Sequence, residues 1–229
     1  MPPGAKPKPP APPARCRVWI IEDHLSIRQL LQGFVSSLPG FAVAGSSPDA
    51  APALRGVRAG QVDLVILDLM IQGGGGIGAL LKFRGETNPP RVVIYSATAT
   101  MHSLQLALSH GATGYVAKTD SVEELGLALK RVRAGGTHLS PDPARLLASS
   151  PKPRVGARKT VGEVELGVLD KLARGTTVKG TALDLGLSLQ KVYRVRQTLM
   201  ERSGARTPQD LTRYAIEMGL VSAHRSDLG

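Results

Sequence analysis

From Arg17 to about Ala134, short apolar runs alternate with segments of helical periodicity, and this alternation limits the possible folds more than any other feature. The apolar runs are residues 18–21, 41–44, 64–67, 92–95 and 114–117, and the helical segments are residues 27–38, 49–59, 77–84, 101–110 and 121–134. Near-continuous apolar strands are typical of a parallel sheet that is covered on both faces. The pattern therefore predicts a doubly wound α/β fold with a five-stranded parallel sheet. Its functional crevice should lie at the carboxyl ends of the strands.

The composition changes between about residues 140 and 159, where prolines and glycine accumulate as they do in linkers. Beyond this stretch no strand pattern recurs, and four helical segments follow at residues 161–174, 178–185, 189–202 and 208–218. A small all-α domain of four helices is therefore expected. We divide the chain into a disordered proline-rich tail (1–14), an α/β domain (15–147), a linker (148–158) and a helical domain (159–229).

Basic residues are in excess, and the formal net charge is +11. The excess is densest in residues 151–229, where 14 Lys and Arg stand against 8 Asp and Glu. A small basic domain indicates a polyanionic partner, and nucleic acid is the commonest one in the cytoplasm. No apolar run approaches the roughly 20 residues that cross a bilayer, and the N-terminus lacks a signal-peptide core. We expect a cytoplasmic protein without membrane contact, and the single cysteine fits a reducing compartment.

Polar side chains follow four of the five predicted strands. Glu22 and Asp23 come directly after the first strand, and Asp68 follows the third. Ser96 follows the fourth strand and Lys118 the fifth. Because the carboxyl ends of parallel strands meet at one edge of the sheet, these groups should converge. Clustered carboxylates need a cation such as Mg²⁺ to offset their charge, and the whole set is suited to holding a phosphoryl group that one aspartate accepts covalently.

Residues 15 to about 147 resemble the receiver domain of two-component response regulators. The resemblance rests on Ile-Glu-Asp-His at residues 21–24, Val-Asp-Leu-Val-Ile-Leu-Asp-Leu at 62–69, glycine at 76, Val-Ile-Tyr-Ser-Ala at 93–97 and Gly-Ala-Thr-Gly-Tyr-Val-Ala-Lys at 111–118. It implies that Asp68 is the phosphoacceptor. By the same resemblance, Mg²⁺ is bound by Glu22, Asp23, Asp68 and the backbone carbonyl of Met70. The resemblance also implies that the switch group consists of Ser96, the switch hydroxyl, Tyr115, the switch aromatic residue, and Lys118, the lysine that contacts the phosphate.

The chain departs from the receiver pattern after the phosphoacceptor. Gln72 stands where the family usually has proline, and four consecutive glycines follow at residues 73–76. No Gly-Lys-Ser/Thr follows them, so they do not form a phosphate-binding P-loop. Glycines raise the entropy cost of ordering a loop. We expect a flexible loop without a special role.

Residues 178–185, a Gly-Leu-Ser turn and residues 189–202 have the order of a helix-turn-helix. In the second helix, Val192, Val195 and Leu199 share one face, which should be core. The opposite face carries donors and cations that suit a DNA major groove. The candidate DNA-contact residues are Gln190, Lys191, Tyr193, Arg194, Gln197 and Thr198 on this helix, with Lys179 and Arg206 near helix ends as phosphate contacts.

Residues 161–220 resemble the LuxR-type helix-turn-helix that follows the receiver in one large subfamily of regulators. The resemblance is carried by Glu165, Leu169, Gly175, Ala182, Leu185, Leu187, Ser188, Val192 and residues 206–211. Lys191 and Arg196 depart from the residue types usual in this family. They could rotate the second helix or shift the face of it that contacts DNA. An apolar stripe on the last helix, formed by Leu211, Tyr214, Ala215 and Met218, is in part a candidate contact for a homodimer on double-stranded DNA.

The leading hypothesis is a DNA-binding response regulator, not an enzyme, that a sensor histidine kinase phosphorylates on Asp68 and that controls transcription. One alternative is an atypical DNA-binding regulator that a partner or ligand controls without phosphorylation, and the glycine loop is its only support. Another is a small phosphohydrolase that uses Asp68 as its nucleophile. Such an enzyme usually needs a second acid two residues on, where Met70 stands.

Overall fold

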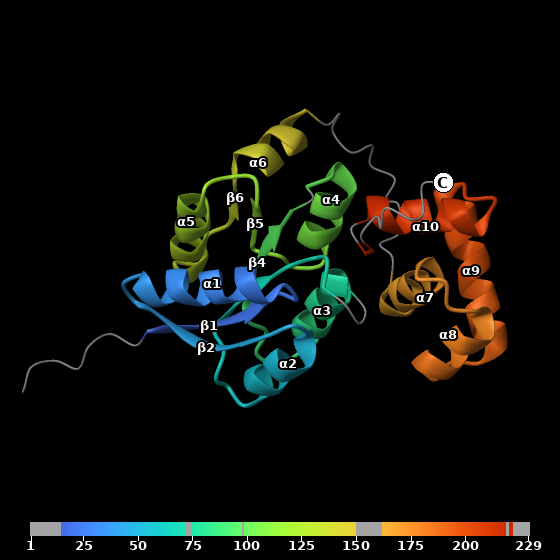
Figure 1. The fold of residues 1–229 in the computed structure, drawn as a ribbon, viewed down its shortest axis with the longest axis horizontal. Coiled ribbons are helices and arrows are strands. Elements are labelled where there is room, and N and C mark those ends of the chain that lie inside the picture. The colour runs from blue at the N-terminus through green and yellow to red at the C-terminus, as the bar shows by residue number, and fades with distance from the viewer. Residues whose placement is uncertain (1–14, 72–74, 98, 150–161, 219, 222–229) are drawn as a thin grey trace, which may run out of the picture.

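The computed structural model describes residues 15–71, 75–97, 99–149, 162–218 and 220–221 (Figure 1). The expectations for the tail at 1–14, for residues 72–74 and for the linker beyond residue 149 lie outside these ranges. Within them, every helix is too short or too polar to cross a membrane.

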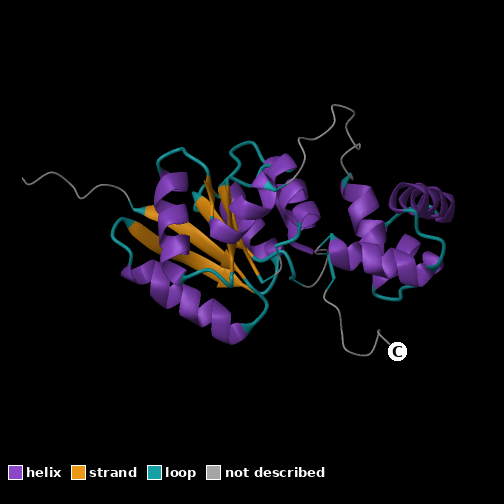
Figure 2. Cartoon of the chain, turned by 90° about the horizontal axis from the view of Figure 1, so that it is seen from above, coloured by secondary structure: helices purple, strands orange, loops and turns teal. Residues whose placement is uncertain are grey.

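A parallel sheet forms the centre of the N-terminal domain (Figure 2). Its strands are β1 (Cys16–Ile21), β2 (Phe41–Ser47), β3 (Leu64–Leu67), β4 (Arg91–Ser96), β5 (Gly114–Ala117) and β6 (His138–Leu139). Their order is β2-β1-β3-β4-β5-β6, and all pairs are parallel. The expected doubly wound fold is confirmed, and the sheet has one short strand more than the five expected.

Helices cover both faces of this sheet, as the continuous apolar strands require. The helices are α1 (Leu25–Ser37), α2 (Ala50–Arg58), α3 (Gly75–Arg84), α4 (Met101–Ser109), α5 (Val122–Arg133) and α6 (Pro141–Ala148). On one face, Val18, Ile20 and Ile66 pack against α1 and α5. On the other face, Val65 and Leu67 pack with residues of α2, α3 and α4.

Residues 138–139 and 141–148, at the start of the proline-rich stretch, form β6 and α6. Pro141 and Pro143 do not break α6, because proline is tolerated in the first turn of a helix, where no intrahelical N–H bond is lost. Ser140, directly before α6, is fully buried. Its hydroxyl accepts a hydrogen bond from Ala117 N (3.1 Å) and donates one to Asp120 Oδ2 (2.5 Å). These bonds hold β6 and α6 against β5.

Four helices form the C-terminal domain, as the sequence predicts. They are α7 (Glu163–Ala173), α8 (Val178–Leu185), α9 (Leu189–Ser203) and α10 (Pro208–Glu217). Thr177, Ser188 and Thr207 cap the N-termini of α8, α9 and α10 through their hydroxyl groups. The turn between α8 and α9 contains Gly186 in the left-handed region (φ 62°), a conformation that favours glycine.

Candidate functional site

The carboxyl ends of β1, β3 and β5 bring three charged side chains together. Ile21 and Leu67, the last residues of β1 and β3, are partners in the parallel register. Glu22 and Asp68 directly follow them and therefore start from neighbouring positions. Lys118 follows β5, and its Nζ lies 2.7 Å from Glu22 Oε2 and 2.7 Å from Asp68 Oδ2. Both carboxylates are almost fully buried, so the convergence expected from the sequence is present for these three residues.

Lys118 supplies the positive charge at this edge of the sheet. Burial, the largest single effect, lowers the pKa of its ammonium group. The attraction and hydrogen bonds of Asp68 and Glu22 together outweigh burial, so the pKa of Lys118 lies above its ordinary value. Its Nζ also lies 5.7 Å from the ring centroid of Tyr95. Lys118 is therefore charged at neutral pH and offsets part of the negative charge of the two carboxylates.

Asp23 lies beside this cluster and contacts a residue that the sequence analysis did not single out. His24 Nδ1 is 3.0 Å from Asp23 Oδ1 and 3.1 Å from Glu22 Oε1. The geometry of the Asp23 contact is not that of a hydrogen bond, and among the described residues Asp23 Oδ1 is buried without a hydrogen-bond partner. The position of His24 directly after two acids is the signal that could have found it.

Ser96 and Tyr115 lie in the protein interior, and both are fully buried. Burial raises the pKa of the Tyr115 hydroxyl, and hydrogen bonds to Ser103 and Ser96 partly oppose this effect. The Tyr115 hydroxyl is 3.4 Å from Ser103 Oγ. Ser103 also forms a capping box with Thr100 at the start of α4. Ser103 was not predicted as a site residue, although the Thr-x-x-Ser spacing at the start of a predicted helix marks this kind of turn.

The chain after β3 is held against the Asp68 side chain and the Leu69 backbone. Met70 N donates a hydrogen bond to Asp68 Oδ1 (3.0 Å), and Gly76 N donates one to Leu69 O (2.9 Å). A Cβ at Gly76 would lie 2.4 Å from Asp68 O and 2.5 Å from Leu69 Cα. The expectation of a loop without a special role is therefore wrong for Gly75 and Gly76. They are buried in the first turn of α3, where only glycine allows so close an approach at residue 76.

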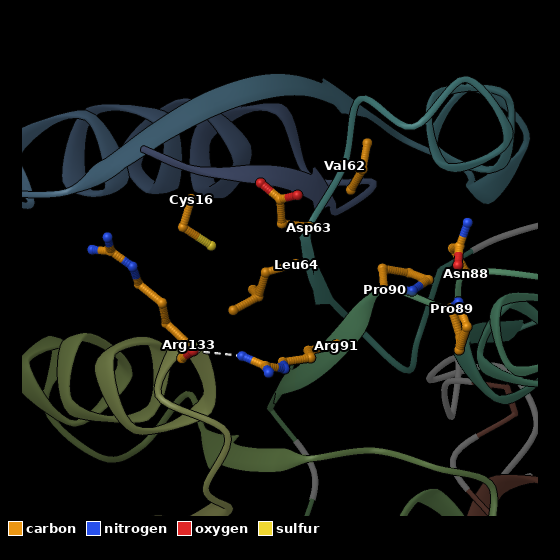
Figure 3. Close-up of a pocket in the computed structure, with 9 residues that line it drawn as sticks. All are labelled: Cys16, Val62, Asp63, Leu64, Asn88, Pro89, Pro90, Arg91 and Arg133. Carbon is orange, nitrogen blue, oxygen red and sulfur yellow. Dashed lines mark hydrogen bonds between the residues drawn. The ribbon is translucent and has the colours of Figure 1, made fainter. Parts of the chain in front are cut away.

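A cavity of about 250 Å³ opens at the opposite edge of the sheet, where β1, β3 and β4 begin (Figure 3). Its lining residues are Cys16, Val62, Asp63, Leu64, Asn88, Pro89, Pro90, Arg91 and Arg133. Burial raises the pKa of the Cys16 thiol, and the charge of Asp63 adds to this effect. The thiol is therefore protonated at neutral pH and is a weak nucleophile. The cavity is separate from the site around Asp68.

In the C-terminal domain, α9 has one buried and one exposed face. Val192, Val195 and Leu199 are buried in the core, as expected. The opposite side of the helix faces solvent. Gln190, Lys191, Tyr193, Arg194 and Gln197 are exposed, Thr198 is half-buried, and Lys179 and Arg206 are exposed near their helix ends. The unusual residues Lys191 and Arg196 leave the helix in its expected orientation, because its three apolar residues still face the core.

Comparison with known proteins identifies the class to which this fold and site belong. A family model described as the response regulator receiver domain matches residues 18–130. The transcriptional regulatory protein UhpA of Escherichia coli strain K12 is 30% identical over 200 residues, which cover 87% of this chain and 97% of UhpA. The chain belongs to the response regulators.

Individual relatives show how far along the chain this similarity extends. The transcriptional regulatory protein MctR of Rhizobium johnstonii is 28% identical over 213 residues, 91% of this chain and 96% of MctR. A solved two-component response regulator of the LuxR family from Aurantimonas is 31% identical, with a TM-score of 0.56 over 59% of this chain and 96% of that chain. RcsB of Salmonella typhimurium, at 19% identity, shares the fold, with a TM-score of 0.67 over 90% of this chain and 98% of that chain.

Proposed function

We propose that the protein is a LuxR-type response regulator that a sensor histidine kinase phosphorylates on Asp68 and that binds double-stranded DNA as a homodimer to control transcription. The observation that carries the proposal is the buried cluster in which Lys118 Nζ lies 2.7 Å from both Glu22 and Asp68. Relatives with the same two-domain extent are named as transcriptional regulators, and RcsB has been solved in a complex with DNA.

Asp68 is suited to act as the nucleophile. Its Oδ1 is held by Met70 N and its Oδ2 by Lys118, so the carboxylate has a fixed orientation at the edge of the sheet. In the transfer, the P–N bond of the donor phosphohistidine breaks as a P–O bond to Asp68 forms, and the donor imidazole leaves with the electron pair. Lys118 would then neutralise a phosphoryl oxygen, and the Ser96 hydroxyl would donate a hydrogen bond to another.

The donor set fits Mg²⁺, which binds oxygen ligands of high negative charge. Glu22, Asp23 and Asp68 would hold the ion, with the Met70 carbonyl as a further ligand. The buried Asp23 Oδ1, which accepts no hydrogen bond from the described residues, supports this assignment. When bound, Mg²⁺ would offset the charge of the carboxylates and of the incoming phosphoryl group.

Asp23→Ala is expected to weaken Mg²⁺ binding by about 10-fold or more, because it removes one charged ligand from a site with few alternatives. Isothermal titration with MgCl₂ measures this affinity. Asp142→Ala is the matched control, since Asp142 is an exposed aspartate on α6 whose loss changes the net charge equally. Equal affinities for the two variants would exclude Asp23 as a ligand.

The exposed face of α9 and its flanking cations are proposed to divide the work of DNA binding. Gln197→Ala should cost about 1–3 kcal/mol on a specific site and relax discrimination there, because its amide can pair with base edges. Lys179→Ala should weaken specific and random DNA alike, and it should reduce the salt slope by about one. Titrations of a duplex selected from a random pool, and of the unselected pool, at two salt concentrations measure both effects.

Identical losses on both DNA types for the two variants would contradict this division. Gln190→Ala serves as a further variant of the same residue type on the same exposed face. Arg194 belongs with the base-contact group, and its alanine variant should behave like that of Gln197.

Incubation with Mg²⁺ and acetyl phosphate, followed by intact-mass and gel-shift measurements, tests the proposed function. A phosphoryl adduct on Asp68 with altered DNA affinity is expected. Unaltered DNA affinity after full labelling would favour the regulator that is controlled without phosphate. Rapid multiple turnover of acetyl phosphate would favour a phosphohydrolase, although Met70 offers no general acid at the position that such an enzyme needs.

The division into a receiver (15–147), a linker (148–158) and a DNA-binding domain (159–229) is part of the proposal, as is the cytoplasmic location. The packing of α6 against α4 and β5 supports the assignment of residues 141–147 to the receiver.

A further inference from the structure

The cavity at the edge of the sheet opposite Asp68 is lined by both apolar and cationic groups. The Cys16 thiol and the Leu64 side chain line it and are buried. Arg91, at the start of β4, and Arg133, the last residue of α5, line it as well (Figure 3). A ligand in this cavity would therefore meet apolar atoms and two guanidinium groups.

The acids on the chain connections at this edge are already paired. Asp63, directly before β3, accepts hydrogen bonds from the backbone N–H and the guanidinium of Arg17, and the ion pair measures 2.6 Å. Glu86, between α3 and β4, pairs with Arg58 at 2.8 Å. Each of these carboxylates is thus neutralised by an arginine outside the pair that lines the cavity.

Arg91 and Arg133 keep their charges without such a partner. The Arg91 guanidinium donates hydrogen bonds to Val132 O (2.8 Å) and to Arg133 O, which fix its position but do not cancel its charge. The Arg133 guanidinium lies 5.3 Å from the centroid of the Phe41 ring. Among the described residues, neither guanidinium has a carboxylate within ion-pair distance. The wall of the cavity therefore carries excess positive charge.

The Cys16 thiol shows that these charges act inside the cavity. Burial, the largest effect, raises the pKa of the thiol, and the charge of Asp63 raises it further. The charges of Arg133, Arg91 and Arg17 lower it. Three guanidinium groups and one carboxylate are thus close enough to act on a group at the position of the thiol, and their net charge is positive.

The helix ends at this edge add to the positive field. Helices α2, α3 and α5 end here, and each carries basic residues in its last turn. Cations at helix C-termini stabilise the helix dipole, which accounts for most of these residues. Arg133 has a further property, because it also lines the cavity. The field of the whole edge attracts anions toward the cavity.

We propose that this cavity binds a small organic anion with one carboxylate or phosphoryl group on a short apolar body. Guanidinium groups suit such heads, because their planar N–H donors match the geometry of the oxygens. The volume of about 250 Å³ corresponds to roughly eight water molecules of the liquid and lies below the range of sites for drug-sized ligands. Binding here does not depend on phosphorylation of Asp68 and goes beyond the proposed function.

Benzoate is a suitable probe, because it joins a carboxylate to a compact apolar ring. Amide chemical shifts of the ¹⁵N-labelled full chain, recorded without Mg²⁺, locate where it binds. Benzoate should shift the amides of Cys16, Leu64 and Arg91 in a saturable manner. Benzyl alcohol has nearly the same size without the charge, and it should bind at least about 5-fold more weakly because it lacks charge-assisted hydrogen bonds.

Arg133→Gln removes one of the two unpaired cations and should lower the affinity for benzoate at least about 5-fold. Lys130→Gln is the matched control, since Lys130 is exposed in the same last turn of α5 and does not line the cavity. It removes an equal charge that solvent screens, so the affinity should change less than about 2-fold. A thermal melt shows whether each variant is folded. The comparison of benzoate with benzyl alcohol uses the unmodified protein and decides the question even if Arg133→Gln unfolds.

Phenyl phosphate extends the comparison to a phosphoryl head group. Saturable binding of either anion at the cavity supports the proposal, and the tighter of the two identifies the preferred head. Absence of saturable shifts with both anions would overturn it. Equal affinities for benzoate and benzyl alcohol, or equal losses in the two variants, would also overturn it, because binding would then depend on apolar contact alone or on the general field. Shifts caused by a random DNA duplex and by neither small anion would show instead that this edge contacts a polyanion.

Discussion

Asp68→Asn is expected to abolish phosphorylation by small phosphodonors and by kinase while the protein stays folded. The amide has the shape of the carboxylate but cannot form an acyl phosphate. Its carbonyl can still accept the hydrogen bond that Met70 N donates, and Lys118 keeps its partner Glu22. Intact-mass measurement after incubation with acetyl phosphate and Mg²⁺ should show no adduct, and circular dichroism should show an unchanged spectrum.

Asp63→Asn is the matched control for this experiment. Asp63 directly precedes β3 at the opposite edge of the sheet, and it pairs with Arg17 on the surface (2.6 Å). Both changes remove one charge next to the same strand, but only Asp68 lies beside Lys118. Labelling of the Asp63 variant should match that of the unmodified protein. Undiminished labelling of Asp68→Asn would refute the assignment of the phosphoacceptor.

Gly76→Ala is expected to destabilise the protein by roughly 1–3 kcal/mol or more, because the added methyl group would meet backbone atoms. Asp68 O would lie 2.4 Å from the new Cβ, and the backbone cannot move aside as a flexible side chain could. Relief of the clash requires the start of α3 or the chain after β3 to shift. Urea unfolding should show a lower midpoint, and the rate of phosphorylation by acetyl phosphate should fall with it.

Gly78→Ala, two residues further along the same helix, separates this clash from the general effect of losing a glycine. No atom outside the local backbone lies within 4 Å of a Cβ built at Gly78. Alanine is favoured over glycine in helices by up to about 1 kcal/mol, so this variant should be neutral or more stable. Equal destabilisation of the two variants would show that the contact at Gly76 does not matter.

Together these variants test how the chain after β3 links phosphorylation at Asp68 to the position of α3. Asp68 is the proposed phosphoacceptor, and Gly76, in the first turn of α3, lies close against the backbone of that same residue. A Cβ built at the neighbouring Gly75 would lie 3.3 Å from Leu220 Cδ2 of the C-terminal domain. Gly75 and Gly76, which the sequence presents only as part of a run of glycines, therefore lie between the candidate phosphorylation site and the domain that would bind DNA.

The alternation of apolar runs and helical periods was enough to predict the doubly wound sheet and the four C-terminal helices. It was also enough to bring Glu22, Asp68 and Lys118 together, because parallel strands that lie side by side end at the same edge of the sheet. Local signals of this kind depend on the residues of a single strand or helix. They can therefore be recognised without knowing how distant segments pack.

The sequence did not predict β6, α6 or the role of the glycines at the start of α3. A two-residue strand has no periodicity of its own, and β6 forms because β5 leaves an edge to which His138 and Leu139 can pair. Prolines at 141 and 143 are typical of linkers, yet they are accepted in a helical first turn that Ser140 anchors.

What the sequence determined by itself was the set of elements and the side chains at their ends, because these follow from local periodicity and chain connectivity. Only the tertiary structure decided that Gly76 must be glycine, that Ser103 meets Tyr115, and that His102 packs on Tyr214. Each of these depends on the distance between atoms of elements that are separate in the chain. Such distances are set when the whole core packs, and no pattern within one segment records them.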